Sequence, residues 1–195
     1  HAQSHEHDLA NYLRLRALSA GARTLVFDGG YVFDSVYRTV LEYHAASDVA
    51  LFGTSAGGFL TAMAVMRFKK EGLPLPACCG VFTAGGDVAE LGDTFNYLTL
   101  AGFYGHVGAK MDDPMCERAV FLGDADRNDP LVAPIKGDLS DFPPTLLVTG
   151  TRDAVLSSAS MFHLALRRAG RDAELYVFEA MAHGCVPLLS DLPAN

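Results

Sequence analysis

The chain has 195 residues, of which half are hydrophobic and 19% are charged, as expected for one globular domain with a substantial core. Its formal net charge of -8 at pH 7 argues against a nucleic-acid partner, because no basic surface would neutralise the phosphates. The four cysteines form no C-x-x-C pair, so we expect neither a zinc site nor a disulfide framework, and a cytoplasmic location.

The first part of the chain predicts a helix, a strand and a second helix. Residues 1–21 become amphipathic after a polar start, which favours a short helix. The apolar run at 24–27 predicts a strand, and 34–46 has the spacing of a helix. The apolar stripe of this second helix would consist of Val36, Val40, Leu41 and Tyr43.

The middle of the chain predicts two strands around a long helix. Residues 49–52 and 77–84 are short apolar runs, and 56–71 is apolar almost all round, which indicates a buried helix. The stretch 49–66 carries no charge, but a glycine-rich turn in its middle argues against a membrane span. Within 77–84 we expect both vicinal cysteines, Cys78 and Cys79, to be buried.

The remaining chain predicts a cap followed by two strands. Residues 86–120 mix aromatic residues, glycines and charges without a clean period, which suggests a cap or lid-like insertion. Strands are expected at 146–149 and 174–178, with a helix at 155–169 between them. The inner face of that helix would carry Leu156, Met161, Leu164 and Ala165.

Short apolar strands that alternate with helices indicate an α/β fold, with a mostly parallel sheet and helices on both faces. Five strands are expected in this sheet. No repeat, low-complexity tract or interdomain linker is visible, so residues 1–195 are predicted to form a single domain that includes the cap segment.

The strongest local signal is the G-x-S-x-G sequence centred on Ser55, which lies between an apolar run and a long helix. A nucleophilic hydroxyl must project from a sharp strand-to-helix turn, and glycines at Gly53 and Gly57 would remove side chains that clash there. The helix start leaves free backbone N–H groups, so Ala56 is a candidate donor to an oxyanion.

A serine nucleophile needs a base, and the base needs an orienting acid. Asp153 follows the strand expected at 146–149, and His183 follows the strand expected at 174–178. Each candidate therefore comes just after a strand, at the same edge of a parallel sheet as Ser55. We expect Ser55, Asp153 and His183 to form a catalytic triad.

Other histidines and acids have more ordinary interpretations. His163 would lie mid-helix as a packing or surface residue, His44 near a helix end, and His106 in the cap. Asp129 precedes a proline and would shape a turn. We expect two further acids, in a charged loop, to be solvated: Asp124 and Asp126.

Four segments together resemble the bacterial hormone-sensitive-lipase-like esterases of the α/β-hydrolase fold-3 family. GTSAGG at 53–58 is similar to that family's nucleophile elbow, and LVFDGGYVF at 25–33 to its oxyanion segment. The run at 129–153 resembles the segment that leads to the acid, and LYVFEAMAHG at 175–184 resembles the histidine segment.

The resemblance implies a serine carboxylesterase that acts on small, short-acyl esters without a metal or organic cofactor. It implies Gly29, Gly30 and Ala56 as oxyanion donors through their backbone amides. A homodimer formed through the edge beyond the last strand is expected only by resemblance. Four residues of the cap would suit a substrate pocket, or equally a packing role: Phe95, Tyr97, Leu98 and Phe103.

Two departures from the family pattern support an alternative function. Phe27 and Asp28 replace the histidine and the first glycine of the oxyanion segment, and the connection at 31–54 is unusually short. We therefore expect the chain to be truncated and internally shortened relative to the family. The alternative is a catalytically silent α/β-hydrolase remnant that binds a small molecule or another protein.

Overall fold

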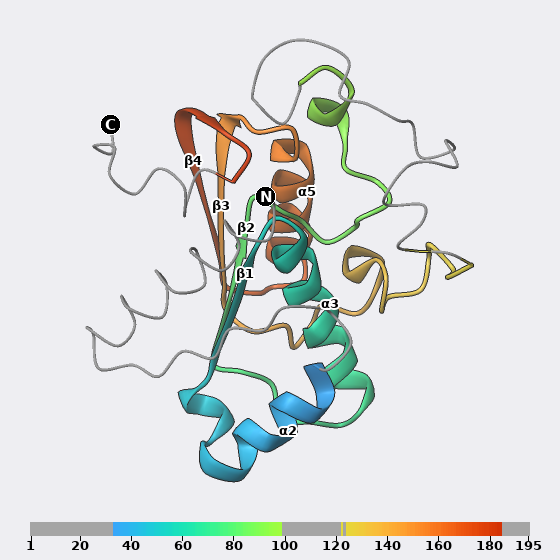
Figure 1. The fold of residues 1–195 in the computed structure, drawn as a ribbon, viewed down its shortest axis with the longest axis vertical. Helices are drawn as coiled ribbons and strands as arrows, with labels where there is room; N and C mark the ends of the chain where they lie inside the picture. The colour runs from blue at the N-terminus through green and yellow to red at the C-terminus, as the bar shows by residue number, and fades with distance from the viewer. Residues whose placement is uncertain (1–32, 99–121, 123, 185–195) are drawn as a thin grey trace, which may run out of the picture. The chain divides into compact units, whose positions relative to one another are not determined.

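A computed structural model describes residues 33–98, 122 and 124–184 of the chain (Figure 1). Its described strands form one parallel sheet in the order β1-β2-β3-β4. Four of the five expected strands are therefore confirmed, and the expected strand at 24–27 lies outside the described residues. The strands are β1 (Ala50–Thr54), β2 (Cys78–Phe82), β3 (Thr145–Arg152) and β4 (Ala173–Ala182).

The helices α3 (Ala56–Lys70) and α5 (Leu156–Arg168) lie on the same face of the sheet (Figure 1). Helix α3 packs on β1 and β2, and α5 packs on β3 and β4. The buried core fills the space between them and the sheet, where Val81 of β2 and Leu147 of β3 are neighbours in register. The expected helix at 56–71 is confirmed, including its largely buried surface.

Helix α5 turns inward a face that overlaps only in part with the predicted one, since Ala165 packs against the core as expected. Met161 and Leu164 are 41% and 47% exposed, so the prediction that they face the core is wrong. The loop after β2 approaches α5 closely: a Cβ at Gly85 would lie 2.2 Å from Ser158 Oγ. This close approach limits the size of the side chain at Ser158, while the glycine at Gly86 leaves room for Phe162. The buried residues of α5 are Ser158, Ala159, Phe162 and Leu166.

Helix α2 (Phe33–Tyr43) is attached to α3 through an aromatic stack. The rings of Tyr37 and Phe68 lie 4.0 Å apart at an interplanar angle of 9°, and Tyr37 donates a hydrogen bond to Pro74 O at 2.9 Å. Tyr43, which the sequence places on the apolar stripe, is 76% exposed. Tyr37 therefore holds α2 against α3, because the Tyr37 side chain, rather than that of Tyr43, faces α3. A short 3-10 helix, η1 (Ala46–Asp48), leads into β1.

The two vicinal cysteines lie in different environments. Cys79 is buried on the helix-covered face, whereas Cys78 is exposed, so the prediction that both are buried is wrong for Cys78. Successive residues of a strand point to opposite faces of the sheet, which separates the two thiols. The face opposite α3 and α5 also exposes Phe52, Leu146 and Tyr176 in part.

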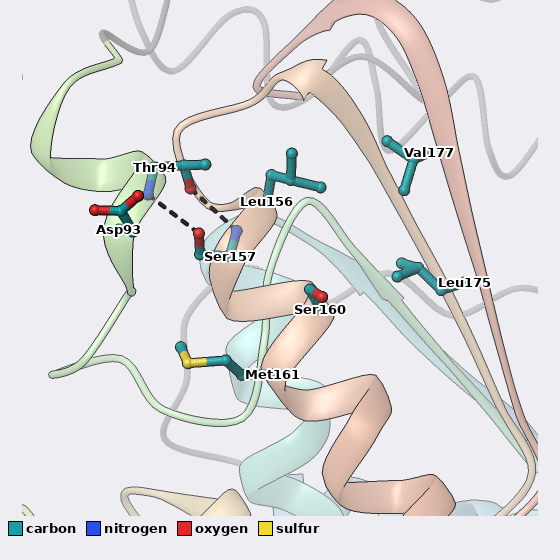
Figure 2. A pocket seen from close by; sticks show the side chains of 8 residues that line it. All are labelled: Asp93, Thr94, Leu156, Ser157, Ser160, Met161, Leu175 and Val177. Carbon is teal, nitrogen blue, oxygen red and sulfur yellow. Dashed lines mark hydrogen bonds between the residues drawn. The ribbon is translucent and has the colours of Figure 1, made fainter.

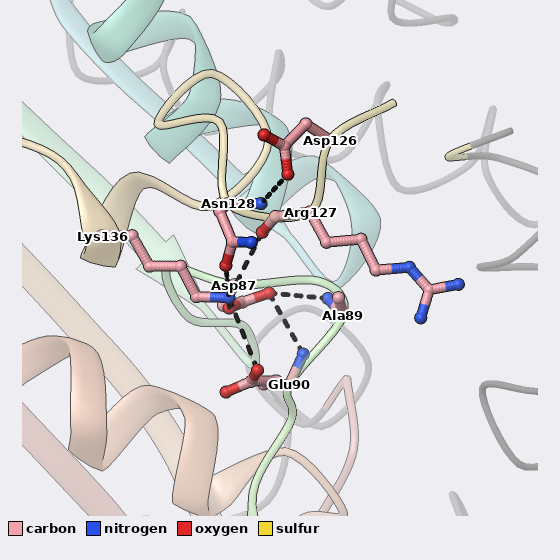
Figure 3. A network of polar contacts seen from close by, with 7 residues as sticks. All are labelled: Asp87, Ala89, Glu90, Asp126, Arg127, Asn128 and Lys136. Carbon is pink, nitrogen blue, oxygen red and sulfur yellow. Dashed lines mark hydrogen bonds and ion pairs between the residues drawn. The ribbon is translucent and has the colours of Figure 1, made fainter. Parts of the chain in front are cut away.

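A partly buried ion pair joins the loop after β2 to the short helix η3 (Pro134–Lys136), as Figure 3 shows. Lys136 Nζ lies 3.1 Å from Oδ2 of Asp87, whose side chain is 4% exposed. Asp87 Oδ1 accepts hydrogen bonds from the backbone N–H groups of Ala89 and Glu90. Hydrogen bonding to Asp87 is the largest cause that raises the pKa of Lys136.

Only residues 86–98 of the predicted cap at 86–120 belong to the described part of the chain. They include a 3-10 helix, η2 (Asp93–Asn96). The cap and the single-domain organisation of residues 1–195 therefore stay predictions. Within the described ranges, none of the helices has both the length and the apolar character needed to cross a bilayer.

Candidate active site

Ser55 occupies a strained turn between β1 and α3. Its φ of 56° and ψ of −122° belong to a region that non-glycine residues rarely adopt. The Ser55 N–H donates to Phe82 O at 2.9 Å, which fastens the turn to β2. The Ser55 carbonyl accepts from Gly58 N at 2.9 Å, and this bond begins α3. The turn holds the Ser55 side chain at the carboxyl edge of the sheet.

The glycines around Ser55 have different structural reasons. A Cβ at Gly53 would lie 2.2 Å from Gly57 O, and one at Gly58 would lie 2.5 Å from the Ala84 Cβ. Both positions therefore require glycine. A Cβ at Gly57 would meet no described atom within 4 Å, so the expected clash is absent there among the described residues.

Asp153 lies in the turn between β3 and α5, and its side chain is fully buried. Its Oδ1 accepts a hydrogen bond from Val155 N at 3.0 Å, and its Oδ2 accepts one from Thr149 Oγ1 at 2.8 Å. A buried carboxylate needs such donors, because removal from water penalises its charge. Thr149 is not among the predicted site residues, since a threonine within an apolar strand carries no distinctive signal.

His183 follows β4 directly, and the last residue of β4, Ala182, pairs with Arg152 at the end of β3. The pairing of the two strands shifts register between Gly150 and Arg152, and Ala180 adopts a φ of 60°. The Ala180 N–H donates to Thr151 Oγ1 at 2.8 Å. This irregularity bends the end of β4 across β3 and brings the imidazole to the loop that holds the acid.

The structure brings the three predicted side chains together in one hydrogen-bonded chain. Ser55 Oγ lies 2.7 Å from His183 Nε2, and His183 Nδ1 lies 2.8 Å from Asp153 Oδ1. The His183 side chain is 15% exposed and that of Asp153 is fully buried. In the tautomer that suits both contacts, Nδ1–H donates to the carboxylate and Nε2 accepts the serine proton. Such an arrangement can activate a hydroxyl as a nucleophile.

Of the three predicted oxyanion donors, only Ala56 lies within the described residues. It is the first residue of α3, where backbone N–H groups have no intrahelical acceptor and the helix dipole is positive. Gly29 and Gly30 lie outside the described residues, as do Phe27 and Asp28.

Comparison with known proteins decides the family. A family model described as alpha/beta hydrolase fold matches residues 16–187. The chain belongs to the α/β-hydrolase fold family. An esterase structure from the bacterial hormone-sensitive lipase family is 29% identical with a TM-score of 0.70. The match covers 82% of this chain and 53% of the esterase chain. The parallel sheet with its helices and this likeness confirm the resemblance to hormone-sensitive-lipase-like esterases.

Two further relatives are similar over most of the chain. An acetyl-hydrolase of Streptomyces hygroscopicus is 26% identical over a match of 157 residues, and the match covers 76% of this chain and 49% of the relative. A solved esterase structure is 34% identical with a TM-score of 0.64, and the match covers 77% of this chain and 46% of that one. The α/β-hydrolase chain therefore spans about half the length of these relatives.

A groove of this α/β-hydrolase lies between η2, α5 and β4, and Figure 2 shows it from close by. The side chains of Ser55, His183 and Asp153 do not line this groove. Its lining residues are Asp93, Thr94, Leu156, Ser157, Ser160, Met161, Leu175 and Val177.

Thr94 connects η2 to the first turn of α5 (Figure 2). Its N–H donates to Ser157 Oγ at 3.1 Å, and its Oγ1 accepts from Ser157 N at 3.0 Å. The same hydroxyl donates to Ala154 O at 2.9 Å. Val155, at the start of α5, makes no side-chain cap, so Thr94 caps this helix from another segment.

The predicted pocket residues are only partly described. Leu98 is buried, Phe95 packs against the core, and Tyr97 is partly exposed. Phe103 lies outside the described residues. The proposed substrate pocket therefore stays a prediction.

Those of the less favoured histidines and acids that the structure describes lie where the sequence predicts. His163 Nε2 contacts Ala173 O at 3.2 Å, which is a packing role, and His44 is exposed beyond the end of α2. Asp129 Oδ1 accepts from Leu131 N at 2.9 Å and so shapes the turn. Asp124 and Asp126 are exposed, and His106 lies outside the described residues.

Proposed function

We propose that this chain hydrolyses carboxylic esters with short acyl groups. Ser55 would act as the nucleophile, His183 as general base and acid, and Asp153 as the residue that orients the imidazole. The main support is the pair of hydrogen bonds, 2.7 Å and 2.8 Å long, that links the three side chains. Family membership supports ester hydrolysis, and the likeness to an acetyl-hydrolase supports a short acyl group.

In the proposed reaction, His183 Nε2 takes the Ser55 hydroxyl proton while Oγ attacks the ester carbonyl carbon. The intermediate collapses, the bond to the alcohol oxygen breaks, and His183 returns the proton to the departing alcohol. Ser55 is left acylated. A water molecule then attacks the acyl carbon with His183 again as base, which releases the acid and restores Ser55. These steps need no metal or organic cofactor.

The negative oxygen of each intermediate would accept hydrogen bonds from the backbone amides of Gly29, Gly30 and Ala56. The position of Ala56 at the start of α3 supports its part in this role. We propose that the ester's apolar groups contact Phe95, Tyr97, Leu98 and Phe103.

The proposed partner is a small-molecule ester, and the acidic net charge of -8 disfavours nucleic acid. A homodimer through the edge beyond β4, and a cytoplasmic location, stay predictions. Tyr176 and Val177 of β4 are exposed to 52% and 43%, which is compatible with such an interface.

Hydrolysis of p-nitrophenyl acetate by the wild type, Ser55→Ala and Ser47→Ala tests the proposal. Ser55→Ala should reduce kcat by about 10⁴-fold or more and abolish the burst of p-nitrophenol, because the acyl group has no oxygen to bind. Ser47→Ala is the matched control, since Ser47 is an exposed serine in η1. Background turnover by the wild type would instead favour the catalytically silent binding module.

A further inference from the structure

Thr149 lies on β3 four residues before Asp153 and is as deeply buried as the carboxylate. Its Oγ1 lies 2.8 Å from Asp153 Oδ2. An ionised carboxylate only accepts hydrogen bonds, so the hydroxyl is the donor. A bond from a neutral donor to a buried anion is stronger than a bond between two neutral groups.

The two oxygens of Asp153 have different partners. Oδ1 accepts from His183 Nδ1 at 2.8 Å and from Val155 N at 3.0 Å, whereas Oδ2 accepts from Thr149. Without the Thr149 bond, the carboxylate could rotate about its Cβ–Cγ bond while one oxygen stays near Val155. The bond to Oδ2 fixes the plane of the carboxylate and keeps Oδ1 directed at the imidazole.

Shape alone does not require a hydroxyl at this position. Valine has nearly the same shape as threonine and suits a buried strand equally well, as its neighbour Val148 shows. Thr145, at the other end of β3, is also buried, but its Oγ1 donates to Pro143 O at 2.7 Å. The Thr149 hydroxyl therefore binds the Asp153 carboxylate, whereas the Thr145 hydroxyl binds a backbone carbonyl.

We propose that Thr149 is a positioning residue that orients Asp153, and through it His183, for the reaction. This inference rests on the proposed function, since it assigns Thr149 a part in the same site. The Thr149 hydroxyl donates to Asp153 and not to Ser55 or His183, so it acts through the carboxylate.

The test compares Thr149→Val, Thr149→Ser and the matched control Thr145→Val. Thr149→Val should lower kcat for p-nitrophenyl acetate about tenfold with KM within about twofold, because the lost bond serves the base and not substrate binding. The acid limb of its pH–rate profile should move to higher pH, because a carboxylate with one donor fewer holds the imidazolium more strongly. Thr149→Ser, which keeps the hydroxyl, should have the wild-type kcat and the wild-type acid limb.

A second readout does not depend on turnover. The Nδ1 proton of His183 should give a downfield proton NMR signal in the wild type and Thr145→Val, and the signal should broaden or vanish in Thr149→Val. If the wild type fails to hydrolyse the ester, the proposed function fails, and this signal alone decides the role of Thr149. If Thr149→Val does not fold, Thr149→Cys, with its weaker S–H donor, replaces it in both measurements.

Either of two results would overturn the inference. The first is a Thr149→Val protein with the wild-type kcat, pH profile and Nδ1 proton signal. The second is an equal loss of kcat in Thr149→Val and Thr145→Val with an unchanged pH profile and signal, which would mean that both threonines only stabilise β3.

Discussion

Gly150 of β3 and Met181 of β4 meet through their backbones. A Cβ built on Gly150 would lie 2.0 Å from the Met181 carbonyl oxygen, a distance that no side chain could tolerate. This close approach occurs where the pairing of the two strands becomes irregular, two residues before His183. The absence of a side chain at Gly150 therefore allows β4 to bring His183 over the acid loop.

We expect Gly150→Ala to reduce kcat by about 100-fold. The added methyl group must push Met181 away, and a displacement of about 1 Å at His183 is enough for a loss of this size. Steady-state hydrolysis of p-nitrophenyl acetate measures the effect, and circular dichroism checks that the variant is folded. Wild-type kcat in a folded Gly150→Ala protein would show that the strand contact does not position the histidine.

Gly170→Ala is the matched control for this prediction. Gly170 has a φ of 73°, but a Cβ there would meet no described atom within 4 Å. The substitution should lower the free energy of unfolding by about 1 kcal/mol through backbone strain and leave kcat within about twofold of the wild type.

We expect Lys136→Met to destabilise the protein by about 2 kcal/mol, because it leaves the buried Asp87 carboxylate without its cation. Urea denaturation measures the loss. The double variant with Asp87→Asn should recover part of it, since the unpaired charge is then gone. Lys70→Met, at an exposed position of α3, is the control, and an equal loss there would contradict a specific role for the ion pair.

We expect the stability of the protein to fall between about pH 10 and pH 12 because of Tyr37. Burial is the main cause that raises the pKa of Tyr37 to about 12. Because the pKa of Tyr37 is higher in the folded than in the unfolded protein, the neutral side chain contributes its full stabilisation of the fold below about pH 10, the pKa of an unfolded tyrosine. This contribution is lost as the pH approaches 12. Tyr37→Phe keeps the ring on Phe68 and should show a smaller fall in urea denaturation at pH 9 and pH 11.5. Identical pH dependence in both proteins would refute the assignment.

We expect the vicinal cysteines to differ in reactivity. Burial is the main cause that raises the pKa of the Cys79 thiol far above its usual range, whereas the Cys78 side chain is exposed. Iodoacetamide at pH 8 should therefore modify Cys78 and spare Cys79 in the folded protein, and modify both in urea. Peptide mass spectrometry distinguishes the two sites, and prompt labelling of folded Cys79 would contradict its burial.

Much of the fold and of the candidate site could be predicted because the signals are local. The turn around Ser55 needs glycine at Gly53, as the G-x-S-x-G sequence predicts, although the second required glycine is Gly58 and not Gly57. Asp153 and His183 each follow an apolar run, and parallel strands bring such positions to one edge of the sheet.

The helix faces and strand irregularities could not be predicted in the same way. Met161 and Leu164 of α5 have a spacing that suits a core, yet both are exposed. The face with Ser158 and Phe162 packs inward instead, against the loop at 85–86. Periodicity shows that a helix has two faces but not how near its neighbours will come.

The sequence by itself determined the order of the described strands and helices, the sharp serine turn and the three residues of the proposed triad. Each of these depends on residue type and spacing along the chain. Only the tertiary structure decided that Thr149 would meet Asp153 and that β4 would bend over Gly150. Both contacts depend on where two separately formed segments come to rest, and backbone packing sets distances of a few ångströms that no local pattern encodes.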